Sequence, residues 1–196
     1  NLKILIIEQG NQYNPRDFHK KKDTWEISKL KKFHLNPNIR KGKCDYKIDN
    51  KLSDIDIANF NGIGGSTVLY SGHFPRLHPS DFKVKNVDNV SFNWPISYNE
   101  LEQYYEMNEK IVGIHGLGDD PAYPKIKNLR SPINLGKSGE LISRAFKKLN
   151  WHCWPSYSAI NTQNNFSVKT VYDTYFPLIK KSKNIKIKKN LEVIKI

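Results

Sequence analysis

The chain has 196 residues, which is enough for one sizeable domain with a hydrophobic core. It carries 32 Lys and Arg residues against 19 Asp and Glu residues, a formal net charge of +13. A surplus of this size favours nucleic acid or an anionic membrane surface as a partner. However, 27 of the 32 basic residues are Lys scattered along the chain, whereas proteins that read grooves and phosphates rely mainly on Arg. The composition therefore favours solvated lysine-rich faces, and a basic, non-catalytic nucleic-acid-binding protein is the alternative.

Cysteine usage and hydropathy exclude several other classes of protein. Cys44 and Cys153 are the only cysteines, and neither belongs to a CxxC pair. The sequence thus predicts no metal site and no disulfide framework. No apolar run approaches the roughly 20 residues that a membrane span needs. We expect a cytoplasmic protein, although a preceding segment could carry a signal for export to the periplasm.

The first predicted element is a β-strand over residues 2–8, LKILIIE. A continuous run of Ile and Leu predicts a parallel strand that is buried on both faces. Glu8 ends this run, in the place where an acid of a dinucleotide-binding unit holds the ribose hydroxyls. The glycine fingerprint of such a unit would lie about 20 residues upstream, before Asn1, so an ordinary strand ending in Glu is the alternative. Residues 11–58 are polar and predict mainly loop, with a short helix over residues 23–30.

The clearest helix signal follows Trp94-Pro95. Ser97 and Glu100 have the S-x-x-E spacing of a capping box, in which each side chain accepts a hydrogen bond from the other residue's backbone. Apolar residues then recur on one helical stripe as far as Val112, and Gly113 is a plausible stop. The pattern predicts a helix that begins just after Ser97.

Four further elements are predicted: a helix over 138–149, a helix over 168–176, a strand over 185–188 and a strand over 191–196. The second of these helices should end before Pro177, since proline disfavours helical geometry in the residue that precedes it. Asn190 should form the turn between the two strands. The order of elements predicts an α/β fold with an inserted region. Because strand-like segments stand at both ends, we expect the chain to be an internal piece of a longer protein, inactive by itself.

A cluster of glycines lies in the middle of the chain, in NFNGIGGSTVLYSGHFPR over residues 59–76. Gly64 and Gly65 lack the Cβ that would keep the backbone away from a ligand. Exposed N–H groups together with the hydroxyls of Ser66 and Thr67 suit phosphate oxygens. The GxGxxG spacing is not met, so the cluster by itself is also compatible with a tight structural turn.

Three motifs together resemble a known family. They are GGST-x-x-Y-S-G over 64–72, R-x-x-P-S-D-F over 76–82 and W-P-I-S-Y-x-x-L-x-x-Y-Y over 94–105. As a set they resemble the glucose–methanol–choline (GMC) family of FAD-dependent alcohol and sugar oxidoreductases, and most of all its bacterial branch of gluconate and sorbitol dehydrogenase large subunits. The resemblance implies an incomplete Rossmann-like, doubly wound FAD-binding domain. Residues 1–97 would belong to this domain, 98–183 to an inserted, mainly helical and loop region on the substrate side, and 184–196 to a strand pair that returns to the domain.

The resemblance also implies roles for particular residues. The FAD pyrophosphate and ribityl chain would lie along Gly64, Gly65, Ser66 and Thr67, and the isoalloxazine against Tyr70, Ser71 and Gly72, with Ser71 nearest N5 and O4. Glu8 would hold the adenosine ribose, and backbone groups of Val193 the adenine edge. Leu69 stands where some relatives carry a flavin-linked His, so FAD should be bound non-covalently.

The implied reaction is hydride transfer from a CH–OH group of an alcohol or sugar to flavin N5. The family's catalytic His lies near the C-terminus of the complete proteins, beyond Ile196, so no catalytic residue is expected within this chain. His73 and His78 are instead expected to be structural groups near the flavin. The partners would be a small-molecule substrate and an electron acceptor that the sequence does not identify.

Overall fold

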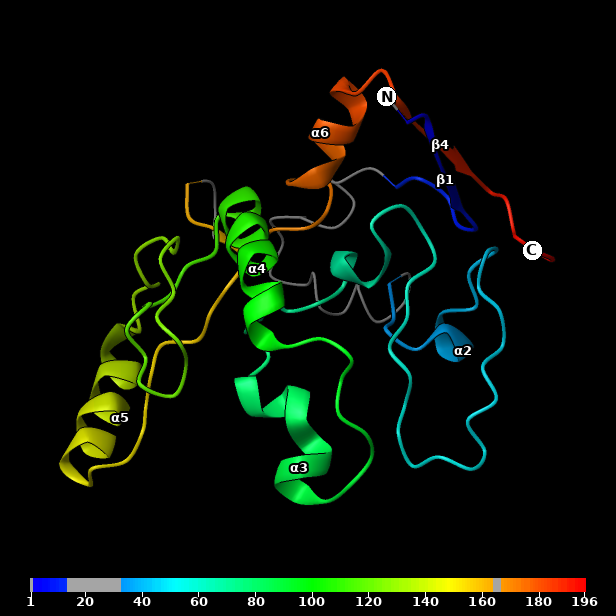
Figure 1. Ribbon diagram of the computed structural model, residues 1–196. Helices are drawn as coiled ribbons and strands as arrows, with labels where there is room; N and C mark the ends of the chain where they lie inside the picture. The colour runs from blue at the N-terminus through cyan, green and yellow to red at the C-terminus, as the bar shows by residue number, and fades with distance from the viewer. Residues whose placement is uncertain (1, 14–32, 164–166) are drawn as a thin grey trace. The chain divides into compact units, whose positions relative to one another are not determined.

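The computed structural model describes residues 2–13, 33–163 and 167–196 (Figure 1). The chain divides into two compact units. Of the described residues, 2–13, 33–71 and 167–196 form the first, here called the terminal unit, and 72–163 form the second, the central unit. The helix predicted over residues 23–30 lies outside the described residues. The domain boundaries implied by the family resemblance stay a prediction.

A parallel pair of strands places the N-terminal and C-terminal segments side by side in the terminal unit (Figure 1). Strand β1 (Ile4–Glu8) pairs with β4 (Ile185–Lys189), with Ile4 opposite Ile185 and Glu8 opposite Lys189. Both strands were predicted and are confirmed. The expectation that β1 is buried on both faces is wrong, since its apolar residues are 37–51% exposed. Within the described ranges β4 is the one strand that pairs with β1, and covered faces would require further layers.

The other elements of the terminal unit are short. They are helix α2 (Pro37–Arg40), the 3₁₀ turn η2 (Gly65–Val68), strand β3 (Ser167–Val168) and helix α6 (Tyr175–Lys181). The core of this unit joins η2 and α6 to the loops around them, through Phe33, Phe60, Ile63, Val68, Leu69, Tyr172 and Phe176.

Two predictions near the C-terminus are wrong. The helix expected over residues 168–176 is replaced by β3, a hydrogen-bonded turn and then α6, which contains Pro177. Proline is tolerated there because the first turn of a helix does not use its backbone N–H groups. The strand expected over residues 191–196 does not form. The turn at Asn190 is confirmed by its left-handed φ of 57°, and beyond it Leu191 donates one backbone hydrogen bond to Glu8.

Helix α4 (Tyr98–Val112) confirms the capping-box prediction in the central unit. The Ser97 Oγ accepts from the Glu100 amide at 3.4 Å, and the Glu100 carboxylate accepts from the Ser97 amide at 2.7 Å. Gly113 ends the helix in the left-handed conformation with φ 68°. The remaining elements of this unit are η3 (Pro79–Lys83), α3 (Val84–Asp88), α5 (Gly136–Lys148) and β2 (Ile160–Asn161).

Helix α5 was predicted over residues 138–149 and is confirmed, with a start two residues earlier. Two of its apolar side chains, Leu141 and Ile142, are more than half exposed. None of the helices in the described ranges combines the length and apolarity that crossing a membrane requires. The structure is α/β, as predicted, with helices and short strands, and the doubly wound cofactor-binding domain stays a prediction.

Candidate cofactor site

Two predicted parts of the cofactor site, about fifty residues apart in the sequence, lie side by side in the terminal unit. The loop after β1 contacts the start of the glycine cluster, where Asn11 and Gly62 form a parallel β-bridge. The Ile63 amide donates to the Asn11 carbonyl at 3.1 Å. Gly10 is packed so closely that a Cβ on it would overlap the backbone of Asn61 and Gly62. Gly10 is therefore required for this contact, because any side chain would separate the two segments.

The segment after β4 reaches the same place. The Asn190 amide donates to the Gly10 carbonyl and the Leu191 amide to the Glu8 carbonyl, each at 3.1 Å. The carboxyl ends of the parallel strands β1 and β4 thus meet beside the glycine cluster, and the carboxyl ends of parallel strands are where open α/β sheets bind ligands. The Glu8 Oε1 accepts from the Gly10 amide at 2.6 Å, which fixes the carboxylate at this edge. Val193 follows two residues after Leu191 and is 55% exposed.

The glycine cluster itself forms a tight turn that leads into η2. The Gly65 amide donates to the Gly62 carbonyl at 2.8 Å, and Gly64 and Gly65 have φ angles of 98° and 53°, which favour glycine. A Cβ built on Gly65 would have no atom within 4 Å, so the space in front of the turn is open. The Ser66 side chain is exposed beside it. An open, backbone-lined turn with an exposed hydroxyl fits the oxygens of a phosphate-containing ligand.

The next residues of the predicted site have different surroundings. Thr67 and Tyr70 both use their hydroxyls within the protein: Thr67 donates to the Gly64 carbonyl at 2.6 Å and Tyr70 to the Lys169 carbonyl at 2.7 Å. Burial, with a smaller contribution from a nearby carboxylate, raises the pKa of Tyr70 to about 12, so its hydroxyl stays protonated and remains a donor. Ser71 is exposed. Gly72, with φ 77°, is the first residue of the central unit.

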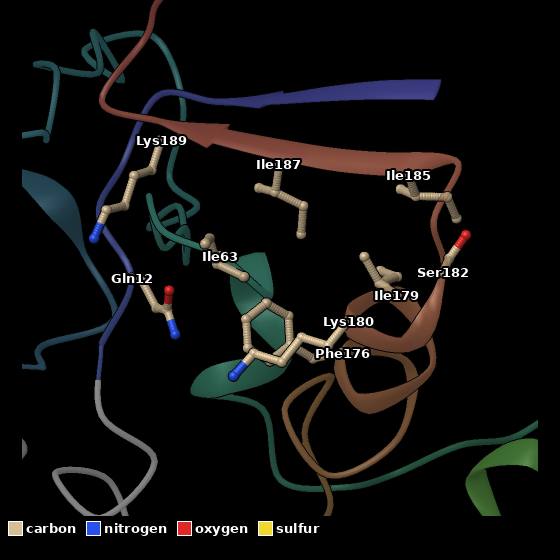
Figure 2. A pocket seen from close by; sticks show the side chains of 9 residues that line it. All are labelled: Gln12, Ile63, Phe176, Ile179, Lys180, Ser182, Ile185, Ile187 and Lys189. Carbon is tan, nitrogen blue, oxygen red and sulfur yellow. The ribbon is translucent and has the colours of Figure 1, made fainter. Parts of the chain in front are cut away.

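A cavity of about 280 Å³ also opens on the terminal unit (Figure 2). Figure 2 shows that Ile185 and Ile187 of β4 point into it, opposite Phe176 and Ile179 of α6. Polar side chains complete its lining: Gln12, Lys180, Ser182 and Lys189. None of the predicted cofactor residues lines this cavity, which lies between β4 and α6.

The central unit holds a buried ion pair that the sequence did not single out. The Arg76 guanidinium donates through Nε and Nη2 to the two carboxylate oxygens of Glu109 at 2.6 and 2.7 Å, and through Nη1 to the Tyr98 hydroxyl at 2.9 Å. The Arg76 and Glu109 side chains are 2% and 5% exposed. Hydrogen bonds and charge from Glu109 raise the pKa of Arg76 although burial opposes this, so it is always charged. The pair joins the segment after Gly72 to helix α4.

The histidines of the central unit make separate polar contacts. His152 Nε2 lies 2.7 Å from the buried Asp120 carboxylate, and His73 Nδ1 lies 2.8 Å from the Ser156 hydroxyl. His78 caps η3 by accepting from the Ser80 amide. Both cysteines, Cys44 and Cys153, are free thiols. No group of three or more His, Cys, Asp or Glu side chains in the described part of the chain has the arrangement of a metal site.

Comparison with known proteins relates the chain to one class of enzymes. The chain is similar to proteins that are named as dehydrogenases and oxidases of alcohols and sugars. A scan against models of protein families finds no match. The names of these relatives give no support to the nucleic-acid-binding alternative.

Three relatives can be named individually. The chain is 36% identical over 165 residues, 82% of its length, to the 2-methyl-1,2-propanediol dehydrogenase of Mycolicibacterium austroafricanum. It is 31% identical over 106 residues, 52% of its length, to the 6'''-hydroxyparomomycin C oxidase of Streptomyces lividus. It is 33% identical over 63 residues, 32% of its length, to the fructose dehydrogenase large subunit of Gluconobacter japonicus. The alignments cover 29%, 19% and 12% of these proteins, so the chain spans less than a third of each.

The structure thus brings Glu8, the glycine turn and the segment before Val193 together. Two contributors to this arrangement were missed by the sequence analysis. Gly10 lies two residues beyond the end of β1, and an isolated glycine beside a strand is a signal for close backbone approach. Residues 169–172, which hold Thr67 and Tyr70, carry no local signal, because their role depends on a contact with residues about a hundred positions away.

Proposed function

We propose that this chain is the FAD-binding part of a GMC-type oxidoreductase that oxidises a CH–OH group of an alcohol or sugar. The observation that carries the proposal is the meeting of Glu8, the glycine cluster and residues 190–191 at the carboxyl ends of β1 and β4. A chain that is similar to named dehydrogenases and oxidases builds there a backbone-lined, open turn next to an acidic residue. Dinucleotide-binding folds use an acid for the ribose hydroxyls and a glycine-rich turn for the pyrophosphate.

Different residues of the chain would bind different parts of the cofactor. Glu8 has one carboxylate oxygen held by the Gly10 amide, and the other is the proposed acceptor for a ribose hydroxyl. The open face at Gly65 and Ser66 would receive the pyrophosphate, and backbone groups of Val193 would receive the adenine edge. The isoalloxazine would lie against Tyr70, Ser71 and Gly72. Gly64 and Thr67 would shape the turn that precedes these residues.

When bound, FAD supplies the redox chemistry by taking up the hydride that leaves the substrate carbon. The chain's residues contribute position and hydrogen bonds. We propose no catalytic acid or base among them, because the catalytic histidine of the GMC family lies near the C-terminus of its complete members. Leu69 is a core residue that is 6% exposed, and we propose that FAD is held without a covalent link. The substrate would be a small alcohol or sugar, in a cytoplasmic enzyme.

The test is a titration of the protein that carries this chain with FAD and, in parallel, with FMN, followed by quenching of flavin fluorescence. FMN lacks the adenosine that Glu8 and Val193 are proposed to hold, so FAD should bind more tightly than FMN. Acid precipitation should release the flavin into the supernatant. Failure to bind FAD would refute the proposed function, and flavin that precipitates with the protein would refute the non-covalent attachment.

A further inference from the structure

The two neighbouring hydroxyls of the glycine turn have unlike surroundings. Thr67 Oγ1 donates to the Gly64 carbonyl at 2.6 Å and accepts from the Val171 amide at 3.3 Å. Ser66 is exposed, and its Oγ lies 3.5 Å from the Asn59 side-chain oxygen, at the outer limit of a hydrogen bond. The Thr67 hydroxyl therefore makes two hydrogen bonds within the protein, whereas the Ser66 hydroxyl makes one long, weak hydrogen bond.

The number of hydrogens decides which of the two can bind a phosphate. A hydroxyl carries a single hydrogen, and an unprotonated phosphate oxygen can only accept. Thr67 already donates its hydrogen to the Gly64 carbonyl over a short distance, so a bond to phosphate would require that bond to break. Ser66 can turn its hydrogen from Asn59 to a ligand at little cost, because the bond it would give up is long and exposed.

The segment that Thr67 contacts is itself firmly held. Thr170, which is 4% exposed, donates to the Asp173 carboxylate through its amide at 2.8 Å and through its hydroxyl at 3.0 Å. Tyr70 makes a second link from the turn to this segment, through the Lys169 carbonyl. Residues 169–172 therefore present a fixed surface to the glycine turn, here called the fastening segment.

Tyr172 extends the fastening segment to the other half of the site. A Cβ on Gly64 would lie 3.5 Å from the Tyr172 ring, so the ring packs directly against the turn. The Tyr172 hydroxyl accepts from the Tyr13 amide at 3.1 Å, in the loop that follows β1. One segment thus contacts both the glycine turn and the loop that follows Glu8.

We propose that Thr67 is a positioning residue that holds the glycine turn against the fastening segment, which leaves Ser66 as the hydroxyl that donates to the phosphate already placed at this turn by the proposed function. The half that concerns Ser66 rests on the proposed function, whereas the half that concerns Thr67 does not. Thr67 acts on the ligand only through the backbone of Gly64 and Gly65, whose conformation its hydroxyl fixes.

The experiment compares Thr67→Val, Thr67→Ser and Ser66→Ala in the protein that carries this chain. Without flavin, amide hydrogen exchange at Val171 is followed by NMR; with flavin, FAD affinity is measured by fluorescence. Thr67→Val keeps the shape and removes the hydroxyl, so Val171 should exchange roughly two- to tenfold faster, which is the loss of one ordinary hydrogen bond. FAD should bind more weakly to this variant. Thr67→Ser should restore both quantities, and Ser66→Ala should weaken FAD binding while exchange at Val171 is unchanged.

The outcomes separate the two halves of the proposal from each other and from the proposed function. If Val171 exchanges at the wild-type rate in Thr67→Val, Thr67 does not fasten the turn. If Ser66→Ala binds FAD as tightly as the wild type, Ser66 is not the phosphate donor. If the wild type binds no FAD, the proposed function fails, and the exchange data still decide the role of Thr67. Thr67→Ala replaces Thr67→Val should the latter not fold.

Discussion

We predict that Gly10→Ala separates the two halves of the candidate cofactor site. A Cβ on Gly10 would overlap the carbonyl of Asn61 and the amide of Gly62. All of these are backbone atoms, so no side-chain rotation can relieve the overlap. The segment that leads into the glycine turn must instead move away from the loop after β1.

The cost can be worked out from the contacts that would change. Inserting a methyl group into a packed site typically costs about 1–3 kcal/mol. The hydrogen bond from the Ile63 amide to the Asn11 carbonyl, 3.1 Å long, crosses the same contact, and its loss adds about 1 kcal/mol. We therefore expect a destabilisation of about 2–4 kcal/mol, together with weaker FAD binding.

The assay is urea unfolding combined with FAD titration, and Gly118→Ala is the matched control. A Cβ on Gly118 would overlap the Ile126 carbonyl in the central unit, among residues that take no part in the proposed site. Both variants should lose stability, but in the absence of urea only Gly10→Ala should bind FAD more weakly than the wild type. The reasoning is wrong if Gly10→Ala unfolds at the wild-type urea concentration, or if both variants bind FAD equally well.

Three other predictions follow from contacts described above. Arg76→Met should lower the free energy of urea unfolding by about 3–5 kcal/mol, because it leaves the buried Glu109 carboxylate unpaired. The additional change Glu109→Leu should recover part of this loss. A loss below about 1 kcal/mol for Arg76→Met alone would contradict the burial of the pair. Glu8→Ala should weaken FAD binding with little effect on kcat at saturating FAD, whereas Ser71→Ala should lower kcat roughly ten- to a hundredfold with little loss of FAD; the opposite split in steady-state kinetics would reverse the two roles. Hydrogen bonds from Ser97, which caps α4, lower the pKa of Glu100 below its ordinary 4.5. The charged carboxylate therefore stabilises the fold above pH 4.5, and this contribution is lost as the pH falls through the lowered pKa. Glu100→Gln should remove this part of the acid sensitivity, which is measured by unfolding at different pH values.

Elements whose signals are local could be predicted from the sequence. The capping box at Ser97 and the stop at Gly113 place helix α4 within a residue of its observed bounds, because both are satisfied by the helix's own backbone. The turn at Asn190 is of the same kind. The glycine turn was located correctly as well, since positive φ angles at Gly64 and Gly65 restrict those positions to glycine.

Elements that depend on distant partners could not be predicted in the same way. The 168–176 segment has an apolar pattern compatible with a helix, but its hydrogen bonds go to Thr67 and Tyr70 and to its own Asp173. Pro177 then falls in the first turn of α6, where it breaks nothing. Residues 191–196 have strand-like composition, but composition does not supply the neighbouring strand that a ladder requires.

The position of the candidate site follows from the register of β1 and β4, which no local pattern contains. Residues directly opposite in a parallel pair point to the same face, so Glu8 shares a face with its partner Lys189. Two and four residues earlier, Ile187 and Ile185 of that face form the wall of the cavity in Figure 2. A slip of one residue would turn Glu8 to the other face and away from the cavity side. The acid at the end of β1 is therefore placed by a pairing that spans most of the chain. Backbone contacts of Gly10 with Asn61, and of Glu8 with Leu191, then help to hold that edge together, which explains why few side chains in the sequence indicate the site.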